Sequence, residues 1–474
     1  DLNFAGEYQP IAHKFVGEIF GEKNIFKAGT VATIAEKTAF GYVKKYEEDT
    51  GKTFSSSEEL ILANGCTGTK RTTGQHPGGI IVVPADREIF EFCPVQKPAN
   101  NRDAEFITTH FDYHKIDKNL LKLDILGHDV PQMIRHLQDM TGVDPLKIDI
   151  ADKKTLSIFT SIDALNILDP DEYEFKHGTY GIPEFGTNFT RGMLDAIQPK
   201  TISALIKISG FSHGTDVWTN NAEDLIKSGV ATIEELISCR DDIMNYLIIK
   251  GVDKSNAFRI MEDVRKNREL KQDELDIMKK HGVPDWYVES CRTLKYLFPR
   301  AHAAAYVIMA LRMAWFKVYY PSAFYCAWLS TKIDNFDVNV AGGGINAVKS
   351  AMNALNSDDD DTSSAKKKEL KVVYEVIYEL LSRGCEFSMP ELGVSDPCMF
   401  NVVDDRINIP FMAVTGVGRS AAISLAEAYK DAPFLSIDEV QRKTKLSSSN
   451  IEDLKACGVF DDLPDSAQVS IFDM

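Results

Sequence analysis

The sequence changes character near residue 131, and this change sets the fold that we expect. Before that point, apolar and β-branched runs at residues 80–83 and 120–126 predict strands, and segments of helical pattern at residues 9–20 and 28–49 alternate with them. Beyond it, apolar residues recur at the three- and four-residue spacing of helices. Since 474 residues exceed what one hydrophobic core supports, we expect a multidomain α+β protein with about three domains.

Glycine-bearing stretches divide the helical middle of the chain. Helical spacing is clear at residues 222–248 and 257–266, whereas residues 178–186 and 210–214 are typical of turns. A polar stretch at residues 356–368, rich in Ser, Asp and Lys, predicts a surface loop between helices. The remainder of the chain predicts a smaller mixed unit that ends in a polar tail.

Composition argues against several classes of protein. No apolar run reaches the roughly 18 residues of a membrane helix, and no secretory signal pattern opens the chain, so we expect a cytoplasmic protein without a membrane segment. The eight cysteines lie far apart without a C-x-x-C pair, which argues against a zinc ribbon or a disulfide framework. A net charge of -17 weakens the hypothesis of a protein that coats DNA, but cations at residues 70–76 and 292–300 are compatible with a local basic channel.

One aspartate, Asp124, stands alone among aliphatic residues at 121–127. On a buried strand such a carboxylate is costly unless a cation or a metal ion compensates its charge. Lys122 is expected on the same strand face, because side chains alternate along a strand, and it could meet a phosphate that the metal also touches. The alternative interpretation is that Asp124 is a structural residue or a cap at the strand end.

A glycine-rich stretch at residues 67–80 is the second motif. Small residues let backbone amides approach an anion closely, and Lys70, Arg71 and His76 add charge and hydrogen-bond donors. The spacing fits neither the Walker A loop nor the dinucleotide-binding fingerprint, which disfavours a P-loop nucleotidase. A tight turn with basic neighbours is the alternative.

A helix is predicted to begin near Arg300 and to continue through residue 317. Helical spacing places His302 and Tyr306 on one face, with Arg300 at the start of the helix. Such a face could stack a base and hold phosphates. A packed aromatic helix with one satisfied histidine is the alternative.

Residues 410–420, followed by a predicted helix at 421–429, show the helix-hairpin-helix pattern. Gly416 and Gly418 alternate with apolar residues, and Arg419 follows at the helix start. In this pattern backbone amides near a helix N-terminus bind DNA phosphates without reading the base sequence. An ordinary tight turn is the alternative.

In this order the motifs resemble the PolC-type alpha subunit of bacterial DNA polymerase III, a C-family replicative DNA polymerase. The resemblance rests on residues 1–4, 74–79, 123–128, 212–218, 301–306 and 468–472. It implies an N-terminally truncated palm of the polymerase-beta nucleotidyltransferase type at 1–131, a large mainly helical fingers domain at 132–330, and a helix-hairpin-helix and clamp-binding region at 331–474.

The resemblance also implies roles for single residues. Asp1 and Asp124 match the second and third of three catalytic aspartates that hold two Mg²⁺ ions. Because the first aspartate would precede Asp1 by two residues, we expect this chain alone to be inactive or nearly so. The implied nucleotide-binding residues are Lys70, Arg71, His76, Gly78, Gly79, Lys122, Arg300, His302 and Tyr306. The implied DNA-binding residues are Gly416, Gly418 and Arg419, and the implied clamp-binding residues are Gln468, Ile471 and Phe472.

We therefore expect a DNA-directed DNA polymerase that joins dNTPs to a primer 3′ hydroxyl by a two-metal mechanism. Its expected partners are primer–template DNA, the bacterial sliding clamp and other replisome subunits. A non-catalytic DNA- and clamp-binding module with a decayed nucleotide site is the alternative, although Lys122 and Asp124 favour the enzyme. A metal-dependent phosphohydrolase is disfavoured because the ten histidines are scattered. The roles of His213 and Asp216 stay open.

Overall fold

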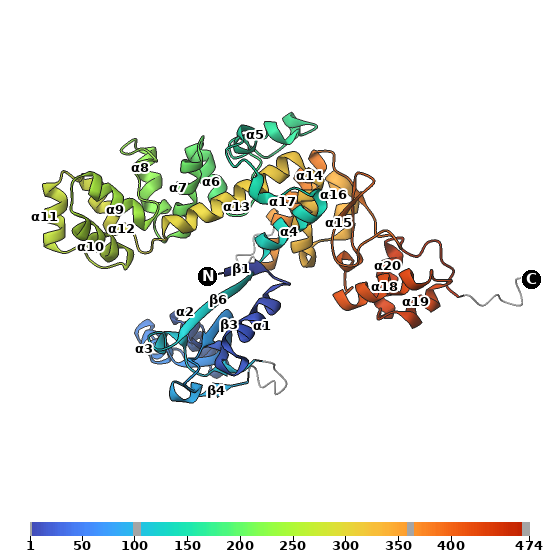
Figure 1. Ribbon diagram of the computed structural model, residues 1–474, viewed down its shortest axis with the longest axis horizontal. Coiled ribbons are helices and arrows are strands. Elements are labelled where there is room, and N and C mark those ends of the chain that lie inside the picture. The colour runs from blue at the N-terminus through green and yellow to red at the C-terminus, as the bar shows by residue number, and fades with distance from the viewer. Residues whose placement is uncertain (1, 98–105, 358–364, 467–474) are drawn as a thin grey trace, which may run out of the picture. The chain divides into compact units, whose positions relative to one another are not determined.

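The computed structural model describes residues 2–97, 106–357 and 365–466. The chain divides into two compact units, Asp1–Gln132 and Met133–Met474 (Figure 1). This division lies one residue from the predicted boundary at 131. No second division corresponds to the predicted boundary at 330, so the three-domain division stays a prediction.

A mixed six-stranded sheet forms the centre of the first unit, in the order β1-β6-β3-β2-β5-β4. The strands are β1 (Leu2–Ala5), β2 (Ile25–Thr33), β3 (Lys70–Val82), β4 (Val95–Gln96), β5 (Thr108–Thr109) and β6 (Leu121–His128). β6 runs parallel to β1 and antiparallel to β3. Helix α1 (Gln9–Phe20) buries Ala12 and Val16 in a core shared with Ile25, Ile80 and Ile125. The predicted helix at 9–20 is confirmed.

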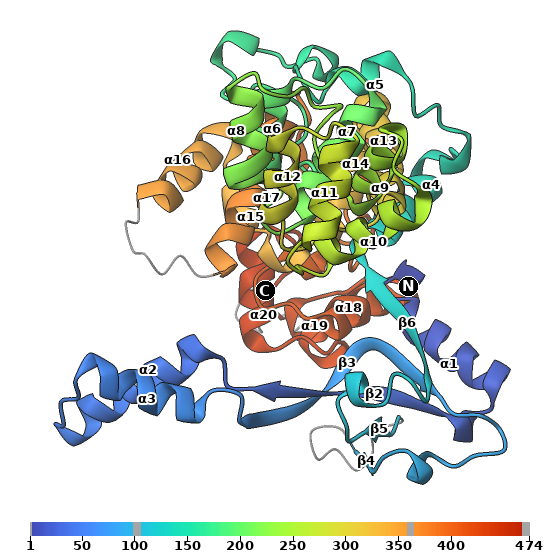
Figure 2. The same cartoon turned by 90° about the vertical axis from the view of Figure 1, so that its left-hand side faces the viewer.

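Strands β2 and β3 form a long antiparallel ribbon that leads to helices α2 (Glu36–Thr50) and α3 (Ser56–Cys66), as Figure 2 shows. A capping box begins α3: the Ser55 side chain accepts from the Glu58 amide, and the Glu58 side chain accepts in return from the Ser55 amide. Ala39, Val43 and Ala63 form a small separate core between the two helices.

The helix predicted at residues 28–49 is wrong for its first part, because residues 28–33 belong to β2. Gly29 explains the strand: its amide donates to Thr109 Oγ1 at 2.8 Å, and a Cβ at this position would lie 1.9 Å from the Thr109 carbonyl oxygen. Glycine, valine and threonine are also poor helix formers, so the tertiary contact decides the outcome. The helix begins at Glu36.

The alternative of a tight turn at residues 67–80 is wrong for most of that stretch, because Lys70–Val82 is strand β3. Its register shifts sharply: Lys27 of β2 pairs with Ile80, whereas Gly29 pairs with Gln75. Residues 76–79 therefore form a bulge in which several residues of β3 lie opposite very few of β2. Gly78 and Gly79 of the motif lie in this bulge.

The second unit is mainly helical. Its helices are α4 (Asp129–Thr141, which begins in the first unit), α5 (Lys153–Ser157), α6 (Asn188–Ile197), α7 (Ile202–His213), α8 (Glu223–Lys227), α9 (Arg240–Ile249), α10 (Lys254–Arg265), α11 (Gln272–Lys280), α12 (Asp285–Thr293), α13 (Arg300–Tyr319), α14 (Pro321–Thr331), α15 (Val338–Gly342), α16 (Gly344–Ser357), α17 (Ala365–Ser382), α18 (Arg419–Asp431), α19 (Ile437–Lys443) and α20 (Ser448–Ala456). A small three-stranded sheet joins β7 (Phe387–Ser388), β9 (Arg406–Asn408) and β8 (Asn401–Val403) in that order. The predicted mixed character of the chain's last part is confirmed.

Helix α13 is the central element of the second unit. It packs against α5, α7, α9 and α14 and buries apolar residues along its length, among them Val307, Leu311 and Phe316. Its buried Lys317 pairs with Glu379 of α17, and burial lowers the pKa of this lysine. Lys317 also donates to the carbonyl oxygen of Gly178 at 2.9 Å. These contacts fix α13 to α17 and to the loop that follows Gly178.

Two details of the helical region differ from the sequence predictions. The turn predicted at residues 210–214 is wrong in part, because Gly210 lies inside α7. A Cβ there would lie 2.6 Å from the Ser238 carbonyl oxygen, so this glycine permits close packing instead of a turn. The continuous helical pattern at 222–248 is divided between α8 and α9. In the described part of the chain, no helix is long and apolar enough to cross a membrane.

Candidate functional site

Asp124 lies on β6 opposite Gly79 of β3. Its Oδ1 atom is 3.0 Å from Nζ of Lys122, yet this buried oxygen accepts no hydrogen bond of good geometry from the described residues. The lysine therefore compensates the negative charge, while a lone pair of the oxygen stays available to a cation. A buried carboxylate oxygen with such a lone pair is the kind of ligand that binds a hard metal ion.

Lys122 meets Asp124 on one strand face, as side-chain alternation predicts. Its Nζ atom also lies 5.1 Å from the ring centroid of Tyr113, and only 14% of the side chain is exposed. The aromatic face and the carboxylate together hold the ammonium group beside Asp124.

His76 lies in the β3 bulge, with its Nδ1 atom 3.7 Å from Asp124 Oδ1. Burial lowers the pKa of His76, and the positive charge of Lys122 lowers it further, so the ring is neutral near pH 7. Nδ1 accepts a hydrogen bond from the Gly78 amide at 3.3 Å, which assigns the proton to Nε2. The approach to Asp124 is therefore no salt bridge, and the Nε2–H group is a donor.

Gly78 and Gly79 allow β3 to approach β6 closely. A Cβ on Gly78 would lie 2.4 Å from Leu126 Cδ2, and a Cβ on Gly79 would lie 2.9 Å from Lys122 Cε. Any side chain at either position would displace β6 or the Lys122 ammonium group. The structure thus brings together five of the residues that the sequence predicted for the site: His76, Gly78, Gly79, Lys122 and Asp124.

Sequence reasoning missed two buried residues near these. Lys27 Nζ on β2 lies 2.6 Å from His13 Nδ1, and His13 Nε2 lies 3.1 Å from the carbonyl oxygen of Ile125, the residue after Asp124. Burial lowers the pKa of Lys27 to about 8. The charge of Lys27 also helps to lower the pKa of His76. A lysine inside the apolar run 25–29 is the signal that could have found it, once that run is read as a strand.

Lys70 and Arg71 lie at the opposite end of the β2–β3 ribbon. Lys70 pairs with Thr33, whereas Lys27 pairs with Ile80, so six residues of β2, or about 20 Å of strand, separate these positions. Lys70 Nζ lies 3.5 Å from His110 Nε2, and Arg71 is exposed. The structure does not bring these two cations to Asp124, and their role stays a prediction.

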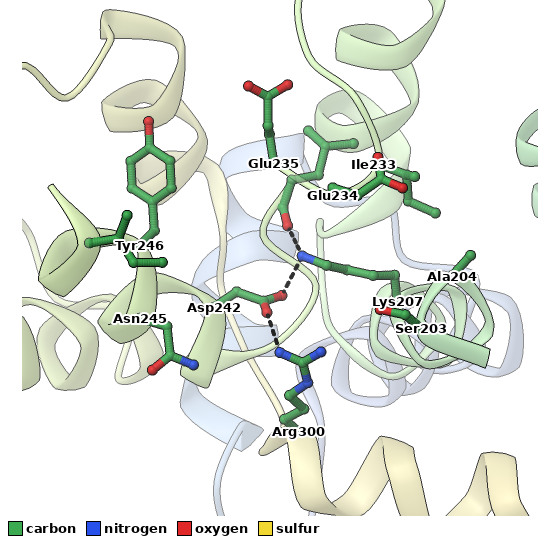
Figure 3. Close-up of a pocket in the computed structure, with 12 residues that line it drawn as sticks. Ser203, Ala204, Lys207, Ile233, Glu234, Glu235, Asp242, Asn245, Tyr246 and Arg300 are labelled. Atoms are coloured by element: carbon green, nitrogen blue, oxygen red, sulfur yellow. Dashed lines mark hydrogen bonds and ion pairs between the residues drawn. The ribbon is translucent and has the colours of Figure 1, made fainter. Parts of the chain in front are cut away.

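In the second unit, Arg300 is the first residue of α13. Its amide donates to Asp241 Oδ2 at 2.6 Å, and its guanidinium Nη1 lies 3.9 Å from Asp242 Oδ1. Figure 3 shows Arg300 and Lys207 pointing toward Asp242 at a cavity of about 220 Å³, with Tyr246 on its wall. Asp242 thus pairs with two cations at this cavity.

His302 and Tyr306 share a face of α13, as predicted, but Arg300 is turned toward Asp242. The His302 ring is stacked on Phe298, with centroids 4.8 Å apart, and lies 4.5 Å from the Tyr306 ring. His213 at the end of α7 packs edge-on against His302 at 5.2 Å. Asp216, the other residue of open role, pairs with Lys295 at 2.7 Å.

The predicted DNA-binding hairpin lies between a 3₁₀ turn, Phe411–Ala413, and α18. Gly416 has a φ of +82°, which favours glycine, and its carbonyl oxygen accepts from Asn450 Nδ2 at 2.8 Å. Gly418 is the N-cap of α18 and offers no side chain to cap the helix, although its carbonyl oxygen accepts from the Ala421 amide at 3.0 Å. Arg419 follows as the first helical residue.

Several predicted site residues lie outside the described residues: Asp1, Gln468, Ile471 and Phe472. The chain neighbour of Asp1, Leu2, pairs with Ile125, the neighbour of Asp124. Within the described ranges, no group of three or more His, Cys, Asp or Glu residues could hold a metal ion. Of the two carboxylates predicted to hold metal, Asp1 and Asp124, only Asp124 lies among the described residues.

Three family models match the chain. The bacterial DNA polymerase III alpha subunit finger domain matches residues 130–283, the bacterial DNA polymerase III alpha NTPase domain matches residues 48–127, and a helix-hairpin-helix motif matches residues 384–469.

The whole chain is also similar to curated proteins that carry the name DNA polymerase III PolC-type. It is 50% identical over 472 residues to that of Caldanaerobacter subterraneus subsp. tengcongensis and 49% identical over 472 residues to that of Halalkalibacterium halodurans. With the protein of Thermotoga maritima it is 48% identical over 472 residues. These alignments cover 100% of the chain but only 34%, 33% and 34% of the relatives, so the chain spans about a third of their length. Over that third, the chain belongs to the family of the PolC-type DNA polymerase III.

Proposed function

We propose that the chain carries the nucleotidyl-transfer site of a DNA-directed DNA polymerase, which adds dNTPs to a primer 3′ hydroxyl under the direction of a template. The observation that carries the proposal is the buried Oδ1 atom of Asp124, paired with Lys122 but without a hydrogen bond from the described residues. The names of the relatives support it.

Asp124 and Asp1 would hold two Mg²⁺ ions, since carboxylate oxygens are the ligands that this hard cation prefers. When bound, the ions lower the pKa of the attacking hydroxyl and offset the negative charge of the phosphates. The pairing of Leu2 with Ile125 supports the choice of Asp1 as the second carboxylate. The inactivity of the chain by itself stays a prediction.

The chain's own donors would bind the triphosphate. Lys122 compensates the negative charge of Asp124 and offers its remaining N–H groups to phosphate oxygens, which gain charge during the transfer. The Nε2–H of neutral His76 donates a further hydrogen bond. Gly79 leaves the space that these two side chains occupy.

The second unit carries the other residues proposed to bind a nucleotide. His302 and Tyr306 present an aromatic face on which a base can stack, while Arg300 can reach phosphate from the first turn of α13. In this proposal residues 1–131 are the palm, 132–330 the fingers, and 331–474 the helix-hairpin-helix and clamp-binding region. Lys70 and Arg71 would then contact nucleic acid away from Asp124.

The last region would hold the enzyme on DNA. Backbone amides at the start of α18, which follows Gly416 and Gly418 and begins at Arg419, are suited to phosphates, because the helix has no side-chain cap. We extend the proposal to a sliding clamp bound through Gln468, Ile471 and Phe472, to other replisome subunits as partners, and to a cytoplasmic location.

The test replaces Asp124 in the full-length polymerase that contains this chain. Asp124→Asn keeps the size of the side chain but removes its charge, and we expect Mg²⁺-dependent primer extension to fall by at least about a hundredfold, since a ligand for charge stabilisation is lost. Asp86→Asn, an exposed residue in a turn of the same unit, is the matched control and should extend primers normally. Undiminished synthesis by Asp124→Asn would remove this residue from the reaction and favour a non-catalytic DNA-binding module.

A further inference from the structure

His213 is hydrogen-bonded through both of its ring nitrogens. Nε2 lies 3.0 Å from Glu184 Oε2, and Nδ1 lies 2.6 Å from the carbonyl oxygen of Ser209. A carboxylate and a carbonyl only accept hydrogen bonds, so each requires an N–H group, and an imidazole with two N–H groups is a cation. The hydrogen bond that His213 donates to Glu184 correspondingly raises the pKa of His213 against the effect of burial.

Glu184 takes a backbone conformation that is unusual for a residue with a side chain. Its φ is +70°, in the left-handed region, which residues other than glycine rarely adopt. Its neighbours hold it there: Ile182 and Phe185 are buried, and Phe185 packs edge-on against Phe159 at 5.0 Å. Such strain persists where the surrounding packing enforces it, and it is concentrated at functional positions.

The charged ring of His213 lies against an aromatic cluster at the start of α13. Its centroid is 5.2 Å from that of His302, 5.6 Å from that of Phe298 and 6.2 Å from that of Tyr306. Burial lowers the pKa of His302, and the charge of His213 lowers it further. The chain of contacts therefore runs from Glu184 through His213 to a neutral His302 and to Tyr306.

We propose that Glu184 is a positioning residue for the incoming dNTP: through His213 it fixes the rings of His302 and Tyr306 in the orientation on which the nucleotide base stacks. This inference rests on the proposed function of the α13 face. Glu184 acts on the nucleotide only through His213. The pair would thus set the affinity for the dNTP, while the rate of the chemical step depends on the groups around Asp124.

The test uses the full-length polymerase and single-nucleotide incorporation at varied dNTP concentration. Glu184→Gln keeps the shape of the side chain but removes the charge that holds the His213 proton, and we expect KM for the dNTP to rise about tenfold with kcat changed less than about threefold. Glu184→Asp keeps the carboxylate and should recover part of the lost affinity. Glu174→Gln, an exposed glutamate that precedes the same loop, is the control and should leave both constants unchanged.

A double variant tests whether Glu184 acts through His213. Because the two residues form one unit, Glu184→Gln combined with His213→Gln should raise KM no more than the larger single change does. Additive effects would overturn the inference. The inference would also be overturned if Glu184→Gln lost activity through kcat alone, with KM unchanged. The same holds if KM is unchanged in Glu184→Gln while Asp124→Asn abolishes synthesis. Full synthesis by Asp124→Asn would instead overturn the proposed function itself.

Discussion

Gly79 determines where the Lys122 ammonium group can lie. A Cβ at this position would meet Lys122 Cε and Ala28 Cβ at 2.9 Å and His76 Nδ1 at 3.0 Å. Gly78 differs, because a Cβ there would meet the Ile125 carbonyl oxygen at 2.7 Å and so would move the backbone of β6. A substitution at Gly79 therefore disturbs the Lys122 and His76 side chains of the site and also presses on Ala28 of β2.

We predict that Gly79→Ala lowers primer extension by the full-length polymerase about tenfold, because it displaces Lys122 from Asp124, and small misplacements of catalytic groups are costly. The secondary structure, measured by circular dichroism, should stay that of the parent. Gly192→Ala, in α6 where an added Cβ meets nothing within 4 Å, is the control and should extend primers at the parental rate. Parental activity in Gly79→Ala would contradict the assigned role of Lys122.

At the scale of elements, the local sequence pattern predicted helices but missed structure that depends on contacts between residues far apart in the sequence. The helix at 9–20 and the start of α13 near Arg300 follow from spacing alone. Residues 28–33 became strand because Gly29 lies against Thr109, a contact across about 80 residues that no local pattern contains. The same holds for the site: alternation predicted that Lys122 meets Asp124, but the pair of Lys27 and His13 forms only when β2 and α1 are packed together.

Strand β2 carries the buried Lys27, and this predicts how the stability of the strand depends on pH. The pKa of Lys27 is about 8 in the folded protein and 10.5 without burial. Between these values the unfolded chain binds more protons than the folded one, so the free energy of unfolding contributed by Lys27 increases as pH rises from about 8 to about 10.5. Below pH 8 the charged group is buried at a constant cost.

The measurement compares the parent with Lys27→Met by hydrogen exchange of β2 amides, corrected for intrinsic exchange rates. The parent should gain stability relative to the variant over this pH range, by up to about 3 kcal/mol in total. Groups common to both proteins cancel in the difference. A difference that is flat or that falls with pH would show that the Lys27 ammonium group is not destabilised by its surroundings.

At the scale of the molecule, each unit has apolar cores of its own. Ile80 lies in a core of the first unit, with Ala12, Val16 and Ile125, whereas Leu311 belongs to the large core of the second. A unit with its own core can unfold by itself. All four tryptophans of the chain, Trp218, Trp286, Trp315 and Trp328, lie in the second unit, so their fluorescence reports that unit alone.

We predict that calorimetry of the chain resolves two transitions, of which tryptophan fluorescence follows one. Ile80→Ala and Leu311→Ala each remove a fully buried side chain, at a cost of about 2–5 kcal/mol. Ile80→Ala should lower, by several degrees, the midpoint of the first unit's transition, which fluorescence does not report. Leu311→Ala should lower the midpoint of the second unit's transition, which fluorescence follows. The two variants serve as controls for each other. If either change moved both midpoints together, the units would unfold as one, and the boundary near Gln132 would have no thermodynamic meaning.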